Sequence, residues 1–408
     1  MPKDQRDYFK VKNCWSEIKD RLLAGYLPQY FQKLLASRRP IYYIDCFAGK
    51  GKFEDGKDGS PIIALNIRDE KMKATKVKNA GISMCFIELN HAQDLLRNIS
   101  VFKRHGIPDV ISGRYEDHIE RLLYDKQGYN VFLYIDPYGI RALDYELLCN
   151  FAKYGFSSIE LLINMNTFGF FRDACRVMRV EKVVRDEAFL DLDDLIVEYE
   201  PTKVDISEQS DTLLTRIAGG DYWKAIVTDY NNGMLDGYTA EKRFSYEYKQ
   251  QLRRLFTYVL DMPIRMKPEH RPKYRMIHAC NHADGCRLMA DNMANRKDEL
   301  FIDIQNQGQL GLFNQTIENE DITQSDLYSK MDKFLEEQQE EIRLNVLLAS
   351  FFTKHGVVCK SGELCRVLQK MEDTNRIVVT RRPSHTPTGK PSRFFTEEKG
   401  QSVTIRRA

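Results

Sequence analysis

Acidic side chains follow three apolar runs in the N-terminal part of the chain, and they are the first candidates for chemistry. Asp45 follows the run IYYI, Glu88 ends the run ISMCFIE, and Asp136 follows the run VFLYI. Apolar runs of this length that are rich in β-branched and aromatic residues are typical of buried parallel strands. Open α/β sheets bind ligands beyond the carboxyl ends of their strands. We therefore expect the three carboxylates to line a shared pocket.

The loop after Asp45 reads CFAGKG and contains two glycines, Gly49 and Gly51. Glycine lets the backbone turn sharply and approach a ligand closely, because it has no Cβ. The loop is therefore either an ordinary β-turn or a binding loop for the cofactor S-adenosylmethionine. On the second interpretation Glu88 accepts hydrogen bonds from ribose hydroxyls, and the loop contacts the cofactor through Asp45, Phe47, Ala48, Gly49 and Gly51.

Two further residues have alternative roles that the sequence leaves open. Asp117 follows the short apolar run VIS, and it either accepts a hydrogen bond from an adenine amino group or caps the next helix. Lys19 lies near the apolar edge of a predicted helix, and it is either a solvated lysine or a cation that points into the mouth of the active site. Both residues are candidates for the site.

The residues Asp136-Pro137-Tyr138-Gly139 resemble the Asp-Pro-Pro-Tyr motif of amino-group methyltransferases. The resemblance implies that the Asp136 carboxylate and a carbonyl held in place by Pro137 accept the two N–H bonds of a target amino group, while Tyr138 stacks on the base. Lys19 joins these residues as a catalytic candidate. The second proline of the motif is missing here, and the alternative is a structural turn that ends a core strand.

Four potential metal ligands occur close together in the sequence. His278, Cys280 and His282 alternate, so they would share one face of a strand, and Cys286 follows soon after. Imidazole and thiolate are preferred zinc ligands. The segment nevertheless has the pattern of a strand, a turn and a helix, and we predict no metal site. The nine cysteines of the chain are scattered, odd in number and without the spacing of a disulfide framework, which favours a reducing compartment. No C-x-x-C pair occurs.

The apolar patterns also predict the elements that position these residues. A leading helix spans 14–37, with Pro28 as a break, and a fifth strand spans 159–164. Residues 166–171 are an aromatic-rich turn whose rings either stack on a base or pack in the core. The fold class that follows is α/β, with a Rossmann-like S-adenosylmethionine methyltransferase sheet in a domain over 1–300.

A helical and acidic insertion interrupts this domain at about 170–260. Within it, the acidic segment over 183–212 is either part of the helical insertion or a mobile lid. Helices are expected over 214–230 and 241–260, where apolar residues recur at helical spacing.

Beyond the first domain the pattern changes. Residues 301–325 are rich in Gln and Asn and predict a linker. The elements after it are predicted as a helix over 327–353, a second helix over 361–371, a strand over 376–383, and a polar loop that leads to 393–396. Two helices followed by a two-stranded ribbon around a basic loop predict a winged-helix domain over 326–408.

Positive charge is concentrated at the C-terminus. From Arg376 to Ala408 there are eight Lys or Arg and two Glu, a net charge of +6. Such a concentration is typical of contact with nucleic-acid phosphates. The candidate contacts are Arg366, Lys370, Arg381, Arg382, Lys390 and Arg393. The alternative is a winged helix that binds a protein and has an incidentally basic tail.

Size and composition limit the remaining possibilities. A chain of 408 residues, 42% hydrophobic and 29% charged, is typical of globular proteins and is long enough for about two to three domains. No run approaches the ~18 apolar residues of a membrane span. The polar N-terminus has no apolar signal core. We therefore expect a cytoplasmic protein without a membrane partner.

Taken together, the motifs resemble those of the bacterial three-Cys-motif partner proteins. The resemblance covers residues 14–300 and rests on Trp15-x-x-x-Lys19, Tyr26-Leu27, YIDCFAGKG, Glu54-Asp55-Gly56, Gly59-Ser60-Pro61 and Ile135-Asp136-Pro137-Tyr138-Gly139. The C-terminal part is similar to the winged-helix domain appended to this family. The layout also resembles, more distantly, that of the ribosomal-RNA adenine-N6 methyltransferases.

This resemblance implies S-adenosylmethionine as the cofactor and a partner protein with a three-cysteine cluster motif, similar to radical S-adenosylmethionine enzymes. One function that follows is methyl transfer to a nucleic-acid amino group, as in adenine N6 methylation. The alternative is a non-catalytic subunit that binds nucleic acid or a partner in a mobile-element or defence system. The missing second proline favours the alternative, and Cys46 also departs from the catalytic pattern, which has a glycine at that position.

Overall fold

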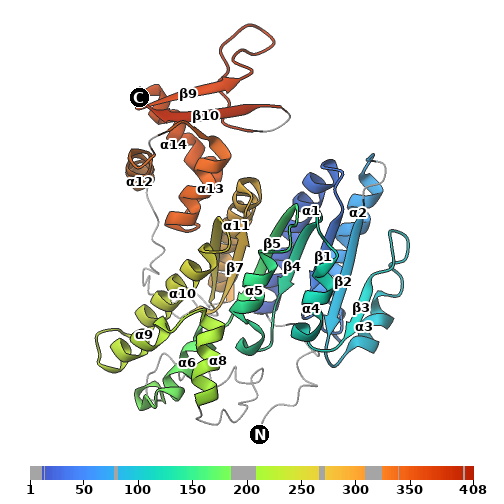
Figure 1. Cartoon of the computed structure of the whole chain (residues 1–408). Helices are drawn as coiled ribbons and strands as arrows, with labels where there is room; N and C mark the ends of the chain where they lie inside the picture. The colour runs from blue at the N-terminus through green and yellow to red at the C-terminus, as the bar shows by residue number, and fades with distance from the viewer. Residues whose placement is uncertain are drawn as a thin grey trace. The chain divides into compact units, whose positions relative to one another are not determined.

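The computed structural model describes residues 12, 14–77, 81–184, 208–265, 272–307, 324–338, 340–397 and 400–408. The chain forms two units, Met1–Asn281 and His282–Ala408 (Figure 1). Most of the acidic segment predicted over 183–212, and most of the linker predicted over 301–325, lie outside the described residues.

A seven-stranded sheet forms the centre of the first unit, with its strands in the order β3-β2-β1-β4-β5-β7-β6 (Figure 1). The strands β1 to β5 pair in parallel, whereas β7 is antiparallel to both of its neighbours. The strands are β1 (Ile41–Asp45), β2 (Ile82–Glu88), β3 (Asp109–Ser112), β4 (Asn130–Ile135), β5 (Ser158–Met165), β6 (Tyr258–Arg265) and β7 (Pro272–Cys280). This mostly parallel sheet, flanked by helices, is consistent with the Rossmann-like α/β fold that the sequence predicted.

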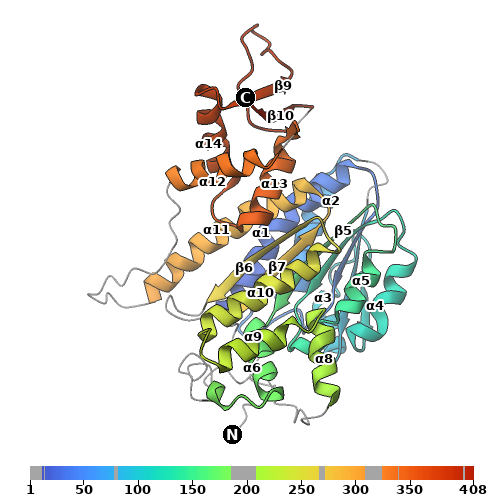
Figure 2. The ribbon, with the colours of Figure 1, turned by 60° about the vertical axis from the view of Figure 1, so that its left-hand side comes forward.

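Successive residues of each strand face opposite sides of the sheet. On one side, Tyr42 and Ile44 of β1 belong to a large apolar core. The helices that contribute to it are α4 (Tyr115–Tyr124), α5 (Tyr145–Phe151), α6 (Thr167–Val177), α8 (Glu208–Ala218), α9 (Tyr222–Asn231) and α10 (Gly237–Arg253). On the other side, Tyr43 packs against Phe132 of β4 and Phe31 of α1 (Cys14–Ala36). Figures 1 and 2 show α4 and α5 on the opposite side of the sheet from α1.

Helix α1 continues through Pro28, where the sequence predicted a break. A proline inside a helix removes one backbone hydrogen bond. The neighbouring Leu27 and Tyr30 are buried, and burial of such large side chains offsets this cost. Because the helix is unbroken, one rigid element holds Lys19 at the sheet.

Two predicted elements of the first unit are wrong. The helix predicted over 241–260 ends at Arg253, and the strand β6 follows at the edge of the sheet. An edge strand accommodates Pro263 because one side of its backbone has no partner strand. The aromatic segment 166–171 is the start of α6 and not a turn, and its phenylalanine rings are buried, as the core alternative required.

Helix α11 (Ala283–Gln307) belongs to the second unit, whereas the sequence placed most of it in the first domain. It packs against α13 (Leu344–His355). Asn345 donates a hydrogen bond to the Asp284 carboxylate at 2.6 Å, and the Cys286 thiol lies 3.7 Å from the carbonyl oxygen of Ala349. These contacts explain why the unit begins near residue 282 and why the helix extends into the predicted linker.

The single helix predicted over 327–353 is two helices, α12 (Gln324–Glu336) and α13, with the short strand β8 (Ile342–Arg343) between them. Residues of β8 pair with Ile405 and Thr404. This long-range pairing overrides the local helical pattern, which is why the sequence did not reveal the break.

The second unit also contains α14 (Ser361–Asp373), β9 (Ile377–Arg382) and β10 (Ser402–Arg407). Its three strands form an antiparallel sheet in the order β8-β10-β9. The second long strand is β10, whereas the sequence placed it at 393–396, where no strand forms. Val403 and Ile405 are fully buried, and their alternation on β10 explains the difference.

Candidate functional site

The loop between β1 and α2 (Ser60–Ala74) follows the central strand at its carboxyl end, with β2 and β4 as the flanking strands. The strand order reverses at this point, and open α/β sheets bind ligands at such points. Gly49 and Gly51 have φ angles of 62° and 76°. These values lie in the left-handed region that favours glycine, so the shape of the loop depends on both residues.

Backbone hydrogen bonds hold this glycine loop in place. The Gly49 N–H donates to Glu88 Oε2 at 2.8 Å, and the Gly59 N–H donates to the Gly51 carbonyl at 2.8 Å. A Cβ at Gly51 would lie 2.8 Å from Cδ1 of Leu95 in α3 (Ala92–Ile99). The loop is therefore closed on itself and leaves no space for a side chain at Gly51.

Glu88 lies at the end of β2, where the sequence predicted it, and its side chain is buried. Its Oε1 accepts hydrogen bonds from the backbone N–H groups of Asn90 and His91 at 2.8 and 3.0 Å, while Oε2 accepts the bond from Gly49. A carboxylate offers about four acceptor positions. Glu88 thus fixes the glycine loop and has about one position left for another donor.

Asp45 ends β1 and is fully buried. The Ser60 hydroxyl donates to its Oδ2 at 2.6 Å, and the Phe47 N–H donates to its Oδ1 at 3.2 Å. Among the described residues, no cation forms an ion pair with Asp45. Burial raises the pKa of Asp45 to about 7, and the nearby carboxylates of Asp136 and Asp20 add to the increase.

Asp136 follows β4 and forms an ion pair with Lys19 of α1. The Lys19 ammonium lies 2.9 Å from Oδ1 and 2.8 Å from Oδ2, and Asn164 Nδ2 donates to Oδ1 at 2.7 Å. The Tyr134 hydroxyl adds a bond to Oδ2 at 3.3 Å. Lys19 is 7% exposed, so the solvated alternative is wrong. Every acceptor position of Asp136 faces a donor in this structure.

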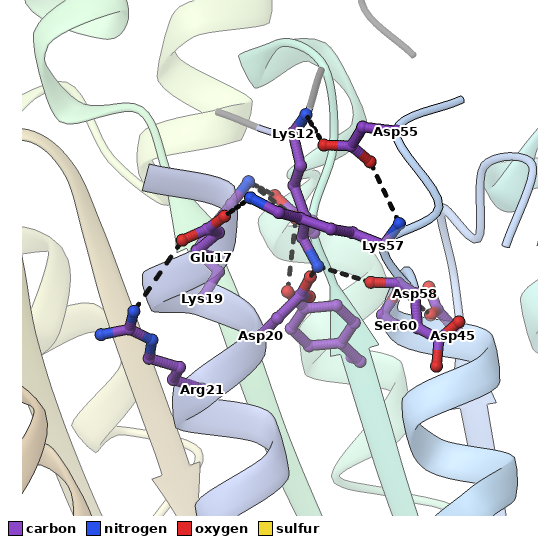
Figure 3. Close-up of polar contacts among 12 residues, drawn as sticks. Lys12, Glu17, Lys19, Asp20, Arg21, Asp45, Asp55, Lys57, Asp58 and Ser60 are labelled. Atoms are coloured by element: carbon purple, nitrogen blue, oxygen red, sulfur yellow. Dashed lines mark hydrogen bonds and ion pairs between the residues drawn. The ribbon is translucent and has the colours of Figure 1, made fainter. Parts of the chain in front are cut away.

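A second ion pair, which the sequence did not indicate, joins Lys12 to Asp20 (Figure 3). The Lys12 ammonium also donates to the Asp58 carbonyl, and the Lys12 N–H donates to Asp55 Oδ2 at 3.1 Å. Burial raises the pKa of Asp20 to about 6, although the Lys12 ammonium opposes the increase. The only signal in the sequence was the position of Asp20 next to Lys19 on one predicted helix.

The structure thus brings together three carboxylates and two ammonium groups. We call Asp20, Asp45, Asp136, Lys12 and Lys19 the carboxylate cluster. Its members come from α1, the residues before it, β1 and the end of β4. The three carboxylates interact through space, because each of Asp136 and Asp20 raises the pKa of Asp45. The cluster therefore joins Asp45, Asp136 and Lys19, which the sequence predicted as site residues, to Asp20 and Lys12, which it did not predict.

The other predicted site residues lie in different environments. Tyr138 is 49% exposed and Pro137 is half-buried, so the segment after Asp136 reaches the surface. Phe47 packs its ring against Tyr115 of α4 at a centroid distance of 5.4 Å. The Ala48 N–H donates to the backbone of β2 at 3.0 Å, so this residue helps to hold the glycine loop.

Asp117 lies in the first turn of α4 and is exposed. The N-cap of this helix is Arg114, three residues earlier, and not Asp117. The capping alternative is therefore wrong. The helix begins earlier than the sequence indicated, at Tyr115, because the side chain of this residue is buried in the core and fixes the position of the first turn.

The four potential metal ligands have other environments. His278 of β7 is fully buried, and its Nε2 lies 3.0 Å from the Glu160 carboxylate. His282 lies beyond the end of β7, so it does not continue the alternation along the strand. In the part of the chain that the structure describes, no group of three His, Cys, Asp or Glu is placed to hold a metal ion.

One of the predicted nucleic-acid contacts has a structural role instead. Arg381 is 8% exposed, and its guanidinium donates two hydrogen bonds to Glu372, each of 2.7 Å. Its Nε donates to the Phe394 carbonyl at 2.9 Å. The guanidinium lowers the pKa of Glu372. Arg381 therefore ties β9 to α14 and is not available to a phosphate.

The remaining basic candidates are exposed on the second unit. Arg366 and Lys370 lie one helical turn apart on α14, and the Lys370 ammonium lies 5.8 Å from the centre of the Tyr328 ring. Arg393 lies 3.7 Å from the Asp373 carboxylate, a distance at which an exposed pair is weak. Arg382 and Lys390 belong to the end of β9 and to the loop after it.

Comparison with models of known protein families finds no match to this chain, and comparison with curated proteins finds no match either. Among the described residues, no helix is both long enough and apolar enough to span a lipid bilayer.

Proposed function

We propose that the first unit binds S-adenosylmethionine and transfers its methyl group to a nucleic-acid amino group, with adenine N6 as the expected position. The observation that carries the proposal is the glycine loop, which is tied to Glu88 where the strand order reverses. The single antiparallel strand β7 between β5 and β6 supports the methyltransferase form of the Rossmann-like fold. The resemblance to three-Cys-motif partner proteins leads to the same expectation.

The residues around the loop suit this cofactor. The positive φ angles of Gly49 and Gly51 give the loop a sharp turn that other residues rarely adopt, and glycine backbone can approach a ligand closely because it has no Cβ. Glu88 has about one acceptor position for a ribose hydroxyl, and Phe47 offers an aromatic ring nearby. When bound, the cofactor supplies an electrophilic methyl group. The chain's own contribution is to hold and orient the reactants.

On the reaction side, Asp136 and the Pro137 region are the expected acceptors for the target N–H bonds, with the exposed Tyr138 ring available for stacking. Asp136 is shared among Lys19, Asn164 and Tyr134, so a target amino group must displace one of these donors. Lys19 has the longest and most flexible side chain of the three. We expect it to be the donor that moves.

The second unit supports a role in nucleic-acid binding. After α11, its element order is helix, short strand, two helices and two strands, and its sheet order β8-β10-β9 is compatible with a winged helix. Its exposed cations, Arg366, Lys370, Arg382 and Lys390, would contact phosphates. Arg393 would contribute less because it lies near Asp373.

A second candidate function is a non-catalytic subunit that binds nucleic acid or a partner protein. The ion pair between Lys19 and Asp136 favours it, because the carboxylate needed for the reaction is fully engaged. The partner expected from the sequence resemblance is a protein with a three-cysteine cluster, and co-purification of the two proteins would test this association.

Calorimetry with S-adenosylmethionine is the first test, with the natural chain compared with Gly51→Val. We expect the natural chain to bind and the variant, whose loop cannot keep its shape, to lose at least about tenfold in affinity. Absence of binding to the natural chain at millimolar cofactor would leave the non-catalytic function as the better candidate.

Transfer of a labelled methyl group to DNA and RNA, followed by identification of the methylated nucleoside, is the second test. Asp136→Ala should abolish transfer while cofactor binding persists. A matched control is Asp125→Asn, an exposed position at the end of α4. Full transfer by Asp136→Ala would exclude the acceptor role of this residue.

A further inference from the structure

The carboxylate cluster contains one more carboxylate than it contains cations. Lys12 pairs with Asp20 and Lys19 pairs with Asp136, and within the described part of the chain Asp45 has only the neutral donors Ser60 and Phe47. Asp45 is nevertheless fully buried. A buried ionised carboxylate is costly unless a positive charge or a proton compensates it. The cluster is therefore one positive charge short of neutrality when its groups are all ionised.

Two buried hydroxyl groups beside the cluster have no hydrogen-bond partner among the residues that the structure describes. Tyr43 is two residues before Asp45 on the same face of β1, it is fully buried, and its hydroxyl has no partner. The carboxylates of Asp45 and Asp20 both raise its pKa after burial does, which indicates that the hydroxyl is close to them. A buried polar group without a partner destabilises the folded chain, so such groups commonly mark the place of a missing polar neighbour.

The second unpartnered hydroxyl is that of Ser16. This side chain is buried, and it lies three and four residues before Lys19 and Asp20 on α1, so the three share one helical face. Ser16 lies inside the helix. Two elements thus present an unsatisfied polar atom beside members of the cluster, β1 beside Asp45 and α1 beside Lys19 and Asp20.

We propose that the carboxylate cluster selects a ligand by its positive charge and so distinguishes S-adenosylmethionine, which carries a sulfonium cation, from S-adenosylhomocysteine, which carries a neutral thioether in its place. This inference rests on the proposed function and adds a property to it. The two ligands are otherwise identical in their polar groups, so the cluster is the feature of the chain that tells them apart.

The preference depends on the charge of Asp45. Below its pKa of about 7 a proton neutralises the carboxylate, and the cluster no longer lacks a positive charge. Above that value the carboxylate is ionised and a cationic ligand can neutralise it, so the preference for the sulfonium increases. The titratable groups that interact with this carboxylate are Asp20 of α1, Tyr43 of β1, Cys46 directly after β1, Tyr134 of β4 and Asp136 directly after β4. The ammonium groups of Lys12 and Lys19 pair with Asp20 and Asp136.

Titration calorimetry of the full chain with each of the two ligands tests the proposal, at about pH 5.5 and at about pH 8. We expect S-adenosylmethionine to bind about tenfold more tightly than S-adenosylhomocysteine at the higher pH, and the ratio to fall towards one at the lower pH. Sinefungin, which carries a protonated amine where the sulfonium stands, should follow S-adenosylmethionine.

Variants separate the charge of Asp45 from its shape. Asp45→Asn should bind the two ligands with similar affinity at both pH values, because an amide keeps the size of the side chain and removes its charge. Ser60→Ala removes a donor that stabilises the ionised carboxylate. It should therefore shift the change in preference to higher pH. Asp125→Asn makes the same charge change far from the cluster and should keep the natural ratio.

The outcomes distinguish this proposal from the one on which it rests. If both ligands bind the natural chain equally at pH 8, the cofactor site stands and the charge selection is wrong. If Asp45→Asn keeps the natural preference, another group is responsible and the proposal is also wrong. If neither ligand binds, the proposed function fails together with this inference.

Discussion

At the scale of single residues, two glycines and one buried carboxylate are the distinctive features of the site. Gly49 and Gly51 have backbone angles that other residues rarely adopt, and Asp45 is a carboxylate buried without a cation. A side chain added at Gly51 would be strained, and the burial of the Asp45 carboxylate has a cost to the folded chain. These costs can be measured by substitution, without knowledge of the ligand.

Gly51→Ala should destabilise the first unit by about 2 kcal/mol, and Gly56→Ala by about 1 kcal/mol. Both glycines have a positive φ, of 76° and 86°. Only Gly51 also has a neighbour, Leu95, within 3 Å of the added Cβ, whereas Gly56 has open space. Urea unfolding measures both changes. Equal destabilisation by the two substitutions would show that close packing at Gly51 has no effect.

Asp45→Asn should change how stability depends on pH. The folded pKa of about 7 lies above the ordinary value of 3.8, so the folded chain binds the proton more tightly. The resulting stability is present in full below about pH 4 and is lost as the pH rises through 7. Since the amide is neutral throughout, the variant should melt above the natural chain at about pH 8, and this advantage should shrink at about pH 5. A pH-independent difference in melting temperature would contradict this expectation.

At the scale of elements, α1 and the alternation along strands decide which polar groups meet. Lys19 reaches Asp136 because α1 passes unbroken over the face of the sheet that carries Tyr43 and Asn164. On β9 the same alternation separates two adjacent arginines, because Arg381 faces α14 and Arg382 faces solvent. One position along a strand therefore changes a candidate phosphate contact into a structural ion pair.

Arg381→Ala should lower stability, whereas Arg382→Ala should weaken nucleic-acid binding. The first removes the two hydrogen bonds that the guanidinium donates to Glu372, and because this carboxylate is partly exposed it should lower the stability of the second unit by about 1–3 kcal/mol. The second should leave stability unchanged, weaken nucleic-acid binding, and reduce the slope of log affinity against log salt by about one. Thermal melts and binding at several salt concentrations measure these effects. Unchanged binding by Arg382→Ala would remove this residue from the interface.

At the scale of the whole molecule, the chain consists of two units, and α11 belongs to the second of them. Asp291 of α11 accepts two hydrogen bonds from Ser361 of α14, each of 2.6 Å. Lys297 donates to the Val357 carbonyl at 3.0 Å. The second unit therefore depends on a helix that the sequence placed with the first.

A fragment over 282–408 should therefore be more stable than a fragment over 324–408. The shorter fragment lacks α11, so it loses the Asp291 and Lys297 contacts and exposes the apolar face of α13. We expect its melting temperature to be lower by about 10 °C or more. Circular dichroism melts of the two fragments measure the difference, and equal melting temperatures would show that α11 is dispensable.

Local patterns in the sequence were sufficient to predict the parallel strands of the sheet and the glycine loop. Strands β1, β2, β4 and β5 are mostly apolar and mostly buried, as strands covered on both faces require. The carboxylates at their ends, Asp45, Glu88 and Asp136, followed directly from the strand boundaries. The loop glycines were recognisable because few other residues adopt a positive φ.

The tertiary structure alone decided the partners of those residues. The structure adds Lys12 and Asp20 to the site that the sequence predicted, and it shows Arg381 in an ion pair and not on the basic surface. Neither ion pair was recognisable from the sequence pattern. The strands β6 and β8 and the unit assigned to α11 likewise depend on long-range pairing or packing. A local pattern encodes which face of an element is apolar, but it does not encode which element covers that face.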